Sequence, residues 1–172
     1  WTSLGSFFNC LFASGDNTGG TISGKLINCV GTSQCYAYGT TTGGSISGTL
    51  RDCIGTTLCY AAGGTTGGTI TTAAILDNIT MSITNWNATM SGVLKNSRID
   101  GTGNTQGAAV KVGSGARIRN CDLKGTTDAI TGGAVTISVT HSNLYGVGYN
   151  AAITLIETNL AGGFNTDLAD TF

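Results

Sequence analysis

A six-residue phrase recurs along the chain: an aliphatic residue, any residue, Asn or Asp, a small residue, any residue and a second aliphatic residue. Apolar and polar positions alternate within it as they do in a half-buried β-strand. Asn and Asp tolerate the left-handed backbone conformation of a sharp bend, so each copy predicts two short strands joined at a corner. Phe8-Asn9-Cys10 looks like a partial first copy. The full copies begin at Leu26, Leu50, Ile75, Leu94, Ile118, Val139 and Leu155.

The pattern is most regular between Gly19 and Thr66, where one block is written twice. The two copies, 19–42 and 43–66, have 24 residues each and are identical at 15 positions. A repeat of this length predicts a solenoid, in which one coil of the chain stacks on the next. The spacing of successive copies varies from 16 to 25 residues, so extra residues must loop outward from the longer coils.

We therefore predict an all-β protein formed by a single right-handed parallel β-helix of about seven coils of irregular length. The aliphatic and small residues of each phrase point inward, whereas Lys95, Arg98, Arg119 and Asp122 point outward. A second corner of the coil lies at Gly43-Gly44 and Gly67-Gly68. The first corners stack into a ladder whose side chains bond between coils, and its expected members are Asn28, Asp52, Asp77, Asn96 and Asn120.

A leucine-rich repeat is the competing solenoid, because its period is similar. It requires several leucines in each repeat and usually a helical side. The blocks here have one leucine at the lead position and runs of Thr and Gly elsewhere. Because Gly and β-branched residues are poor helix formers, the β-helix is the interpretation that the sequence favours.

We expect one domain, 1–172, with segments 1–18 and 161–172 acting as caps or partner contacts. Both segments are rich in large apolar residues, which would cover the open ends of a solenoid. The segment Ser82–Thr89, which contains Trp86, fits the phrase poorly and predicts an excursion or a strand on another face. Because the chain begins with Trp1 rather than Met, we expect it to be a processed or excerpted piece of a longer protein.

The composition narrows the classes of partner. The chain has 28 glycines, no proline, 10% charged residues and a formal net charge of −1. A near-neutral chain gives no electrostatic indication of nucleic-acid or membrane binding, and we predict neither as a partner. No apolar run is long enough to predict a transmembrane helix.

The cysteines fall in two positions of the repeat. Cys35 and Cys59 occupy one, and the small inward slot of the phrase holds Cys10, Cys29, Cys53 and Cys121. We favour a ladder of buried thiols, because Ser or Thr takes the same slot in other copies. Disulfides between stacked coils are the alternative. The spacing of five residues between paired cysteines differs from that of zinc sites, so no metal or cofactor is predicted.

Other polar residues give no convincing catalytic site, and we assign no catalytic residue. Asp100, Asp122 and Asp128 fall in neighbouring coils and could meet, but a solvated face with ordinary ion pairs is the simpler interpretation. His141 stands where other copies have Asn, which indicates a substitute turn residue. The threonine runs at 40–42 and 65–66 could stack into a flat array of the kind that ice-binding β-helices use, yet the pattern fades after Thr72.

The doubled block resembles repeats of the form Gly-Thr-Phe-x-Asn-Cys-x-Gly-Gly in virion proteins of phages that infect marine and gut bacteria. The residues that carry this resemblance are 24–32 (GKLINCVGT) and 48–56 (GTLRDCIGT), with looser copies at 92–101 and 115–125. The resemblance implies a tail fibre, tailspike or head fibre built on a parallel β-helix, often trimeric. It implies no catalytic residues.

We expect a structural component of a bacteriophage particle: a β-helical fibre, spike or capsid-decoration protein on the surface of the virion. The expected partners are two further copies in a homotrimer and other virion proteins, with host-surface glycan as an additional candidate. Two alternatives stay open on the same fold. One is a polysaccharide depolymerase or lyase, and the other is a bacterial cell-surface adhesin.

Overall fold

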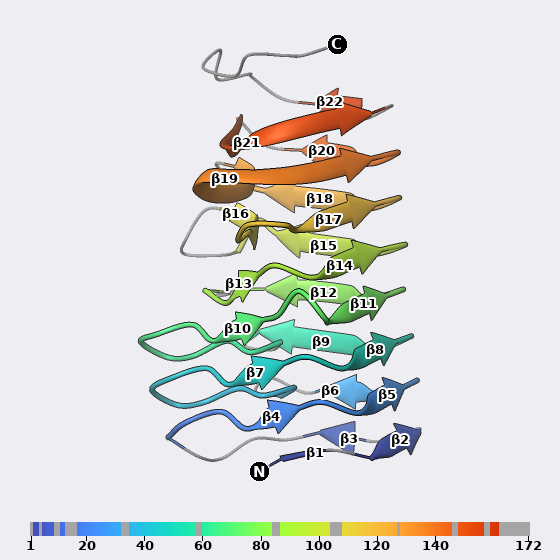
Figure 1. Ribbon diagram of the computed structural model, residues 1–172, viewed down its shortest axis with the longest axis vertical. Coiled ribbons are helices and arrows are strands. Elements are labelled where there is room, and N and C mark those ends of the chain that lie inside the picture. Colours follow the sequence, from blue (N-terminus) through green and yellow to red (C-terminus); the bar gives the residue numbers. More distant parts are fainter. Residues whose placement is uncertain are drawn as a thin grey trace.

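The computed structural model describes residues 2–3, 5–8, 11–12, 17–31, 35–57, 60–83, 87–103, 108–126, 128–145, 148–156 and 159–161. Within these ranges all regular secondary structure is β-strand. The strands lie in layers that stack into an elongated tower, with the first strands at one end and the last at the other (Figure 1). None of the described segments is a helix that could cross a membrane.

The strands form three parallel sheets, which we call A, B and C. Sheet A contains β1 (Thr2–Ser3), β4 (Thr21–Ile22), β7 (Ser45–Ile46), β10 (Thr69–Ile70) and β13 (Thr89–Met90). Sheet B contains β2 (Ser6–Phe8), β5 (Lys25–Ile27), β8 (Thr49–Arg51), β11 (Ile75–Asp77), β14 (Val93–Lys95), β16 (Ala108–Lys111), β17 (Arg117–Arg119), β19 (Asp128–Thr140) and β21 (Gly148–Ile156). Sheet C contains β3 (Leu11–Phe12), β6 (Val30–Gly31), β9 (Ile54–Thr57), β12 (Thr80–Ile83), β15 (Arg98–Gly101), β18 (Asp122–Gly125), β20 (Asn143–Tyr145) and β22 (Asn159–Ala161).

The register of sheet B follows the phrase read from the sequence. From Leu26 to Val139, and with Leu76 in place of Ile75, each lead residue is the direct partner of the lead residue in the next coil and is fully buried. The predicted all-β parallel solenoid is therefore confirmed, and its regular part makes about four turns of about 24 residues. The stacked lead residues are Leu26, Leu50, Leu76, Leu94, Ile118 and Val139.

The third lead position differs from the prediction by one residue. Leu76 pairs with Leu50, whereas Ile75 lies outside the core and is 37% exposed. A turn at residues 72–73 precedes β11 and lengthens this coil. Because a strand alternates its sides with a period of two, beginning the phrase at Ile75 would have turned its apolar side chains to solvent.

The predicted inward and outward positions of the phrase are confirmed in the coil of β14 and β15. Leu94, Ser97 and Ile99 are buried, whereas Arg98 is exposed. In the first two copies the prediction that the second aliphatic residue points inward is wrong, because Val30 and Ile54 are 44% and 46% exposed and the glycine after each takes the inward position. These two aliphatic residues are register partners on the outside of sheet C.

The coils of the doubled block carry an extra segment between sheet C and sheet A, at residues 35–43 and 60–67, which we call the loop stack. Tyr36 and Tyr60 are fully buried, and their ring centroids lie 4.8 Å apart. The Tyr36 hydroxyl donates to the carbonyl of Cys29 at 2.8 Å, and the Tyr60 hydroxyl donates to that of Cys53 at 3.1 Å. The tyrosines thus fill the widened interior and satisfy the carbonyls beside them.

Glycine pairs mark the return from the loop stack to sheet A, as predicted. A Cβ on Gly43 would lie 2.0 Å from the carbonyl oxygen of Ala61, and one on Gly44 would lie 2.0 Å from that of Gly20. Only glycine permits this approach of successive backbones. The amide of Gly43 donates to the carbonyl of Thr66 at 2.8 Å, which joins one coil to the next.

The predicted terminal segments are described in part. Segment 1–18 supplies β1, β2 and β3, which pair with the following coil, and Phe7 there is 41% exposed. In segment 161–172 only Ala161 belongs to the described residues. Within Ser82–Thr89, β12 ends in sheet C and β13 begins in sheet A, whereas Trp86 lies outside the described residues.

Candidate functional site

The corners between sheets B and C hold a row of residues in the left-handed conformation, which we call the corner ladder. Their φ angles lie between 49° and 56°, and they are Asn28, Asp52, Asn78, Asn96, Asn120 and His141. The prediction that Asp77 belongs to this ladder is wrong, because Leu76 begins the phrase and Asn78 occupies the bend. The prediction that His141 is a substitute turn residue is confirmed by its φ of 49°.

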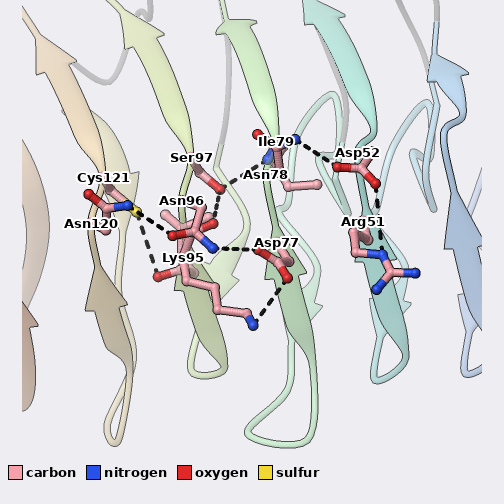
Figure 2. A network of polar contacts seen from close by, with 11 residues as sticks. Arg51, Asp52, Asp77, Asn78, Ile79, Lys95, Asn96, Ser97, Asn120 and Cys121 are labelled. Atoms are coloured by element: carbon pink, nitrogen blue, oxygen red, sulfur yellow. Dashed lines mark hydrogen bonds and ion pairs between the residues drawn. The ribbon is translucent and has the colours of Figure 1, made fainter.

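Side-chain amides connect the corners along the stack (Figure 2). The amide of Asn78 donates to Oδ1 of Asp52 at 2.7 Å, and the amide of Asn120 donates to Oδ1 of Asn96 at 2.9 Å. Asn96 donates instead to Asp77, one residue before the corner, at 2.8 Å. The predicted bonding between coils is therefore present. Its partner differs at the third copy, whose first residue was mispredicted, because Asn96 binds Asp77 there instead of the corner residue Asn78.

Asp77 lies on the outer side of sheet B and is stabilised as a carboxylate. Partial burial opposes ionisation, but the amide of Asn96 and the ammonium of Lys95 lower the pKa of Asp77 below its usual range. The Lys95 Nζ lies 3.1 Å from Oδ2 of Asp77, and both residues come from adjacent strands (Figure 2). The carboxylate thus serves as an acceptor that fixes two neighbouring side chains.

The inward slot after each corner holds a short side chain that can donate a hydrogen bond. Ser97 Oγ donates to the carbonyl of Lys95 at 2.6 Å and accepts from the amide of Ile79 at 3.0 Å. In the same slot, Cys53 Sγ lies 3.2 Å from the carbonyl of Arg51, and Cys121 Sγ lies 3.1 Å from that of Arg119. The slot therefore selects for a small donor as well as for a small volume.

The cysteines divide into two groups. Cys29, Cys53 and Cys121 are buried free thiols, as predicted. Burial raises the pKa of Cys53 and that of Cys121 to about 11, so neither thiol ionises readily. The thiol prediction is wrong for Cys35, which is disulfide-bonded to a partner outside the described residues. Cys10 and Cys59 also lie outside the described residues.

Two of the three candidate carboxylates lie near each other. Asp100 in β15 and Asp122 in β18 occupy adjacent strands and, with Lys124 and Tyr145, line a hollow of about 390 Å³ on sheet C. Asp128 lies elsewhere, in β19 of sheet B. The hydroxyl and the amide of Thr102 bind Asp100 and lower its pKa. A general acid needs a raised pKa, so this carboxylate is suited to ionic contacts rather than to proton donation.

The outer side of sheet B carries a concentration of positive charge that sequence reasoning missed. We call this side the cationic face, and its cations are Lys25, Arg51, Lys95, Arg117 and Arg119. The phrase predicted that Lys95 and Arg119 point outward, but only the register places them in one row. The sequence therefore contained the cations at outward positions of separate strands, and the stacking of the coils brings them together on one face.

The outer side of sheet A carries rows of hydroxyl groups instead. Ser45 pairs with Thr21 and with Thr69, and Thr69 pairs with Thr89. A second row includes Ser23 and Ser47, whose hydroxyls lie 3.2 Å apart. The Thr and Ser array therefore continues into β13, past Thr72, and involves residues other than the runs at 40–42 and 65–66 considered from the sequence.

Comparison with known proteins leaves the family open. No family model matches the chain, and neither a curated protein nor a solved structure matches it. Within the described ranges, no group of three or more His, Cys, Asp or Glu side chains lies close enough to hold a metal ion. The parallel β-solenoid itself agrees with the fold that the phage resemblance implied.

Proposed function

We propose that the chain is a structural component of a bacteriophage particle, a β-helical fibre, spike or capsid-decoration protein that assembles as a homotrimer on the virion surface. The observation that carries this proposal is the continuous parallel pairing of the coils along all three sheets. Such pairing gives a stiff rod whose backbone hydrogen bonds are shared between neighbouring layers, which suits a part that bears load outside a cell.

Three further features support a structural role. The interior is a continuous column of stacked apolar side chains. The corners are fastened by side-chain amides, and the doubled block resembles repeats of phage virion proteins. Other virion proteins would bind along the rod or at its ends, and host-surface glycan is a further candidate partner.

The assembly is tested by light scattering of the purified full chain. A homotrimer gives a mass of about three times 17.3 kDa, and this mass should not change on tenfold dilution. A mass of 17.3 kDa at all concentrations would contradict the trimer. Labelling of intact phage particles with an antibody against the chain tests the location, and the absence of label from particles would contradict the virion assignment.

A glycan-cleaving enzyme is the second candidate, and the hollow with Asp100 and Asp122 is the observation that favours it. Asp100, which is held as a carboxylate, would act as the base on a bound sugar, and Asp122 on the adjacent strand would act as the acid. If the site is catalytic, Asp100→Asn and Asp122→Asn should each abolish cleavage of an acidic polysaccharide. Equal product release by both variants and by the unchanged chain would remove this candidate.

A further inference from the structure

The charges of the chain are unevenly distributed over the faces of the solenoid. The formal net charge is −1, yet five of the eight Lys and Arg residues lie on the cationic face of sheet B. Asp77 is the acid among the described outward positions of strands β5, β8, β11, β14 and β17, and it pairs with Lys95. On sheet C, by contrast, Arg98 is the register partner of Asp122, and Lys124 is that of Asp100.

Three cations of this face, Lys25, Arg117 and Arg119, form no ion pair with a carboxylate of the described residues. Arg117 and Arg119 are both exposed and lie on the same side of β17. In the described part of the chain the ion pairs of this face are Arg51 with Asp52 at 3.8 Å and Lys95 with Asp77 at 3.1 Å. No carboxylate there lies within ion-pair distance of either arginine of β17.

A hollow adjoins Arg119 at the edge of the face. Its volume is about 560 Å³, and it is lined by Arg119, Asn120, Thr140 and His141. A guanidinium group binds a carboxylate through two parallel hydrogen bonds, and hydroxyl and amide groups beside it bind sugar hydroxyls. The hollow therefore combines a cation with the neutral polar groups that an acidic sugar requires.

We propose that the cationic face binds an acidic polysaccharide that runs along the solenoid axis, with one of its carboxylates at Arg119 in this hollow and a second group at Arg117. The inference rests on the proposed function, because it states which face of the solenoid contacts the host-surface glycan and that this glycan is acidic. The neutral positions beside the cations include Thr49, the register partner of Lys25, and Ser138, the register partner of Arg117, whose hydroxyls can bind uncharged parts of the sugars.

A nucleic acid fits this face less well. The described outward positions from β5 to β17 contain no aromatic residue on which a base could stack. Asp77 also interrupts the row between Arg51 and Lys95. A duplex carries a negative charge about every 1.7 Å and would place phosphates against this carboxylate. An acidic polysaccharide has its carboxylates more widely spaced, so the neutral hydroxyl groups between them can face Asp77.

Calorimetric titration of the full chain tests the proposal, with polygalacturonate as the acidic polymer, dextran as the neutral polymer and duplex DNA as the nucleic acid. The test variant is Arg119→Ser. The matched control is Lys111→Ser in β16, which removes one positive charge at an exposed position and lines neither this hollow nor the one with Asp100 and Asp122. Circular dichroism confirms that each variant keeps its strand signal.

We expect the unchanged chain to bind polygalacturonate and not dextran. The arginine variant should lose about tenfold or more in affinity, and the lysine control should stay within about twofold. Equal losses in both variants, tighter binding of DNA, or no binding of polygalacturonate would each overturn the proposal. If the chain is a trimer but does not bind polygalacturonate, only this inference is overturned. If the chain is a monomer that binds polygalacturonate, the inference stands and the proposed trimeric assembly is contradicted.

Discussion

The loop stack and the corner ladder are both columns of repeated residues, but they are stabilised in different ways. The loop stack is built from the inside: Tyr36 and Tyr60 are fully buried and stack on one another. The corner ladder lies outside, and its bonds, such as that from Asn78 to Asp52, join exposed side chains. One column depends on buried volume, and the other depends on backbone conformation and surface hydrogen bonds.

The two columns also end differently. The corner ladder continues through coils of unequal length, because each coil needs only one residue that tolerates the left-handed conformation. The loop stack needs a whole extra segment in each coil and stops after the second. At its last layer the side chain of Asn87 accepts from the amide of Gly63 at 3.1 Å and donates to the carbonyl of Gly63 at 2.8 Å. A side-chain amide thus replaces the backbone of a third loop.

This difference teaches that a solenoid can vary its interior locally while its corner stays constant. Tyr36 and Ala37, like Tyr60 and Ala61, adopt positive φ without being Gly or Asn. Such a conformation costs about 1–2 kcal/mol per residue. The burial and hydrogen bonding of the tyrosines offset this cost, so the loop stack should be the more sensitive of the two columns to truncation.

The largest expected effect is in the loop stack. Tyr60→Ala removes a fully buried ring and leaves the carbonyl of Cys53 without its donor. We expect the free energy of unfolding to fall by about 3–5 kcal/mol, measured by urea denaturation. Tyr145→Ala is the control, because that ring is 41% exposed, and its effect should be below about 1 kcal/mol. Similar losses in the two variants would contradict the role given to buried volume.

The next effect is at the end of the loop stack. Asn87→Ala removes both hydrogen bonds to Gly63, and we expect a loss of about 1–3 kcal/mol. Hydrogen exchange should show reduced protection of the Gly63 amide, with little change at the corner ladder. Asn143→Ala, which removes an exposed bond to Asp122, should leave the Gly63 amide protected. Unchanged exchange in the Asn87 variant would show that its amide does not close the stack.

A smaller effect is expected at the corner ladder. Asn120→Ala places a Cβ-bearing residue without a helpful side chain at a φ of 50°, which should cost about 1–2 kcal/mol. Asn120→Gly loses the same bond to Asn96 but relieves the backbone, so it should be more stable than the alanine variant. Thermal unfolding compares the two, and equal stabilities would mean that the side-chain bond rather than the backbone conformation decides.

The smallest effect at neutral pH is expected in the inward slot. The double variant Cys53→Ser with Cys121→Ser keeps a small donor in each slot and should lose less than about 1 kcal/mol at pH 7. The raised pKa of each thiol stabilises the folded chain below pH 9, and this contribution is lost as pH rises from 9 towards about 11. Denaturation between pH 8 and pH 10.5 should therefore show a steeper decline for the unchanged chain. If the free energy of unfolding declines equally with pH in the unchanged chain and in the double variant, these thiols have the same pKa in the folded and unfolded states.

The sequence by itself determined the solenoid, most of the bend residues and the sides of the strands in the regular copies, but not the bend at Asn78 or the exposed sides of Val30 and Ile54. This was possible because these features depend on local rules: Asn120 accepts positive φ, Ser97 fits an inward slot, and residues such as Leu94 and Ile118 recur at the coil length. The doubled block added the spacing of one coil. None of this required knowledge of which coils are neighbours in space.

Only the tertiary structure decided the register and what the register brings together. The sequence placed the start of the third copy at Ile75, whereas stacking on Leu50 places it at Leu76, because the side chain of Leu76 fills the column. The cationic face likewise exists only when residues from distant coils, such as Arg51 and Arg119, lie on one sheet. Local patterns say which way a side chain points, whereas the pairing of strands decides which charges become neighbours.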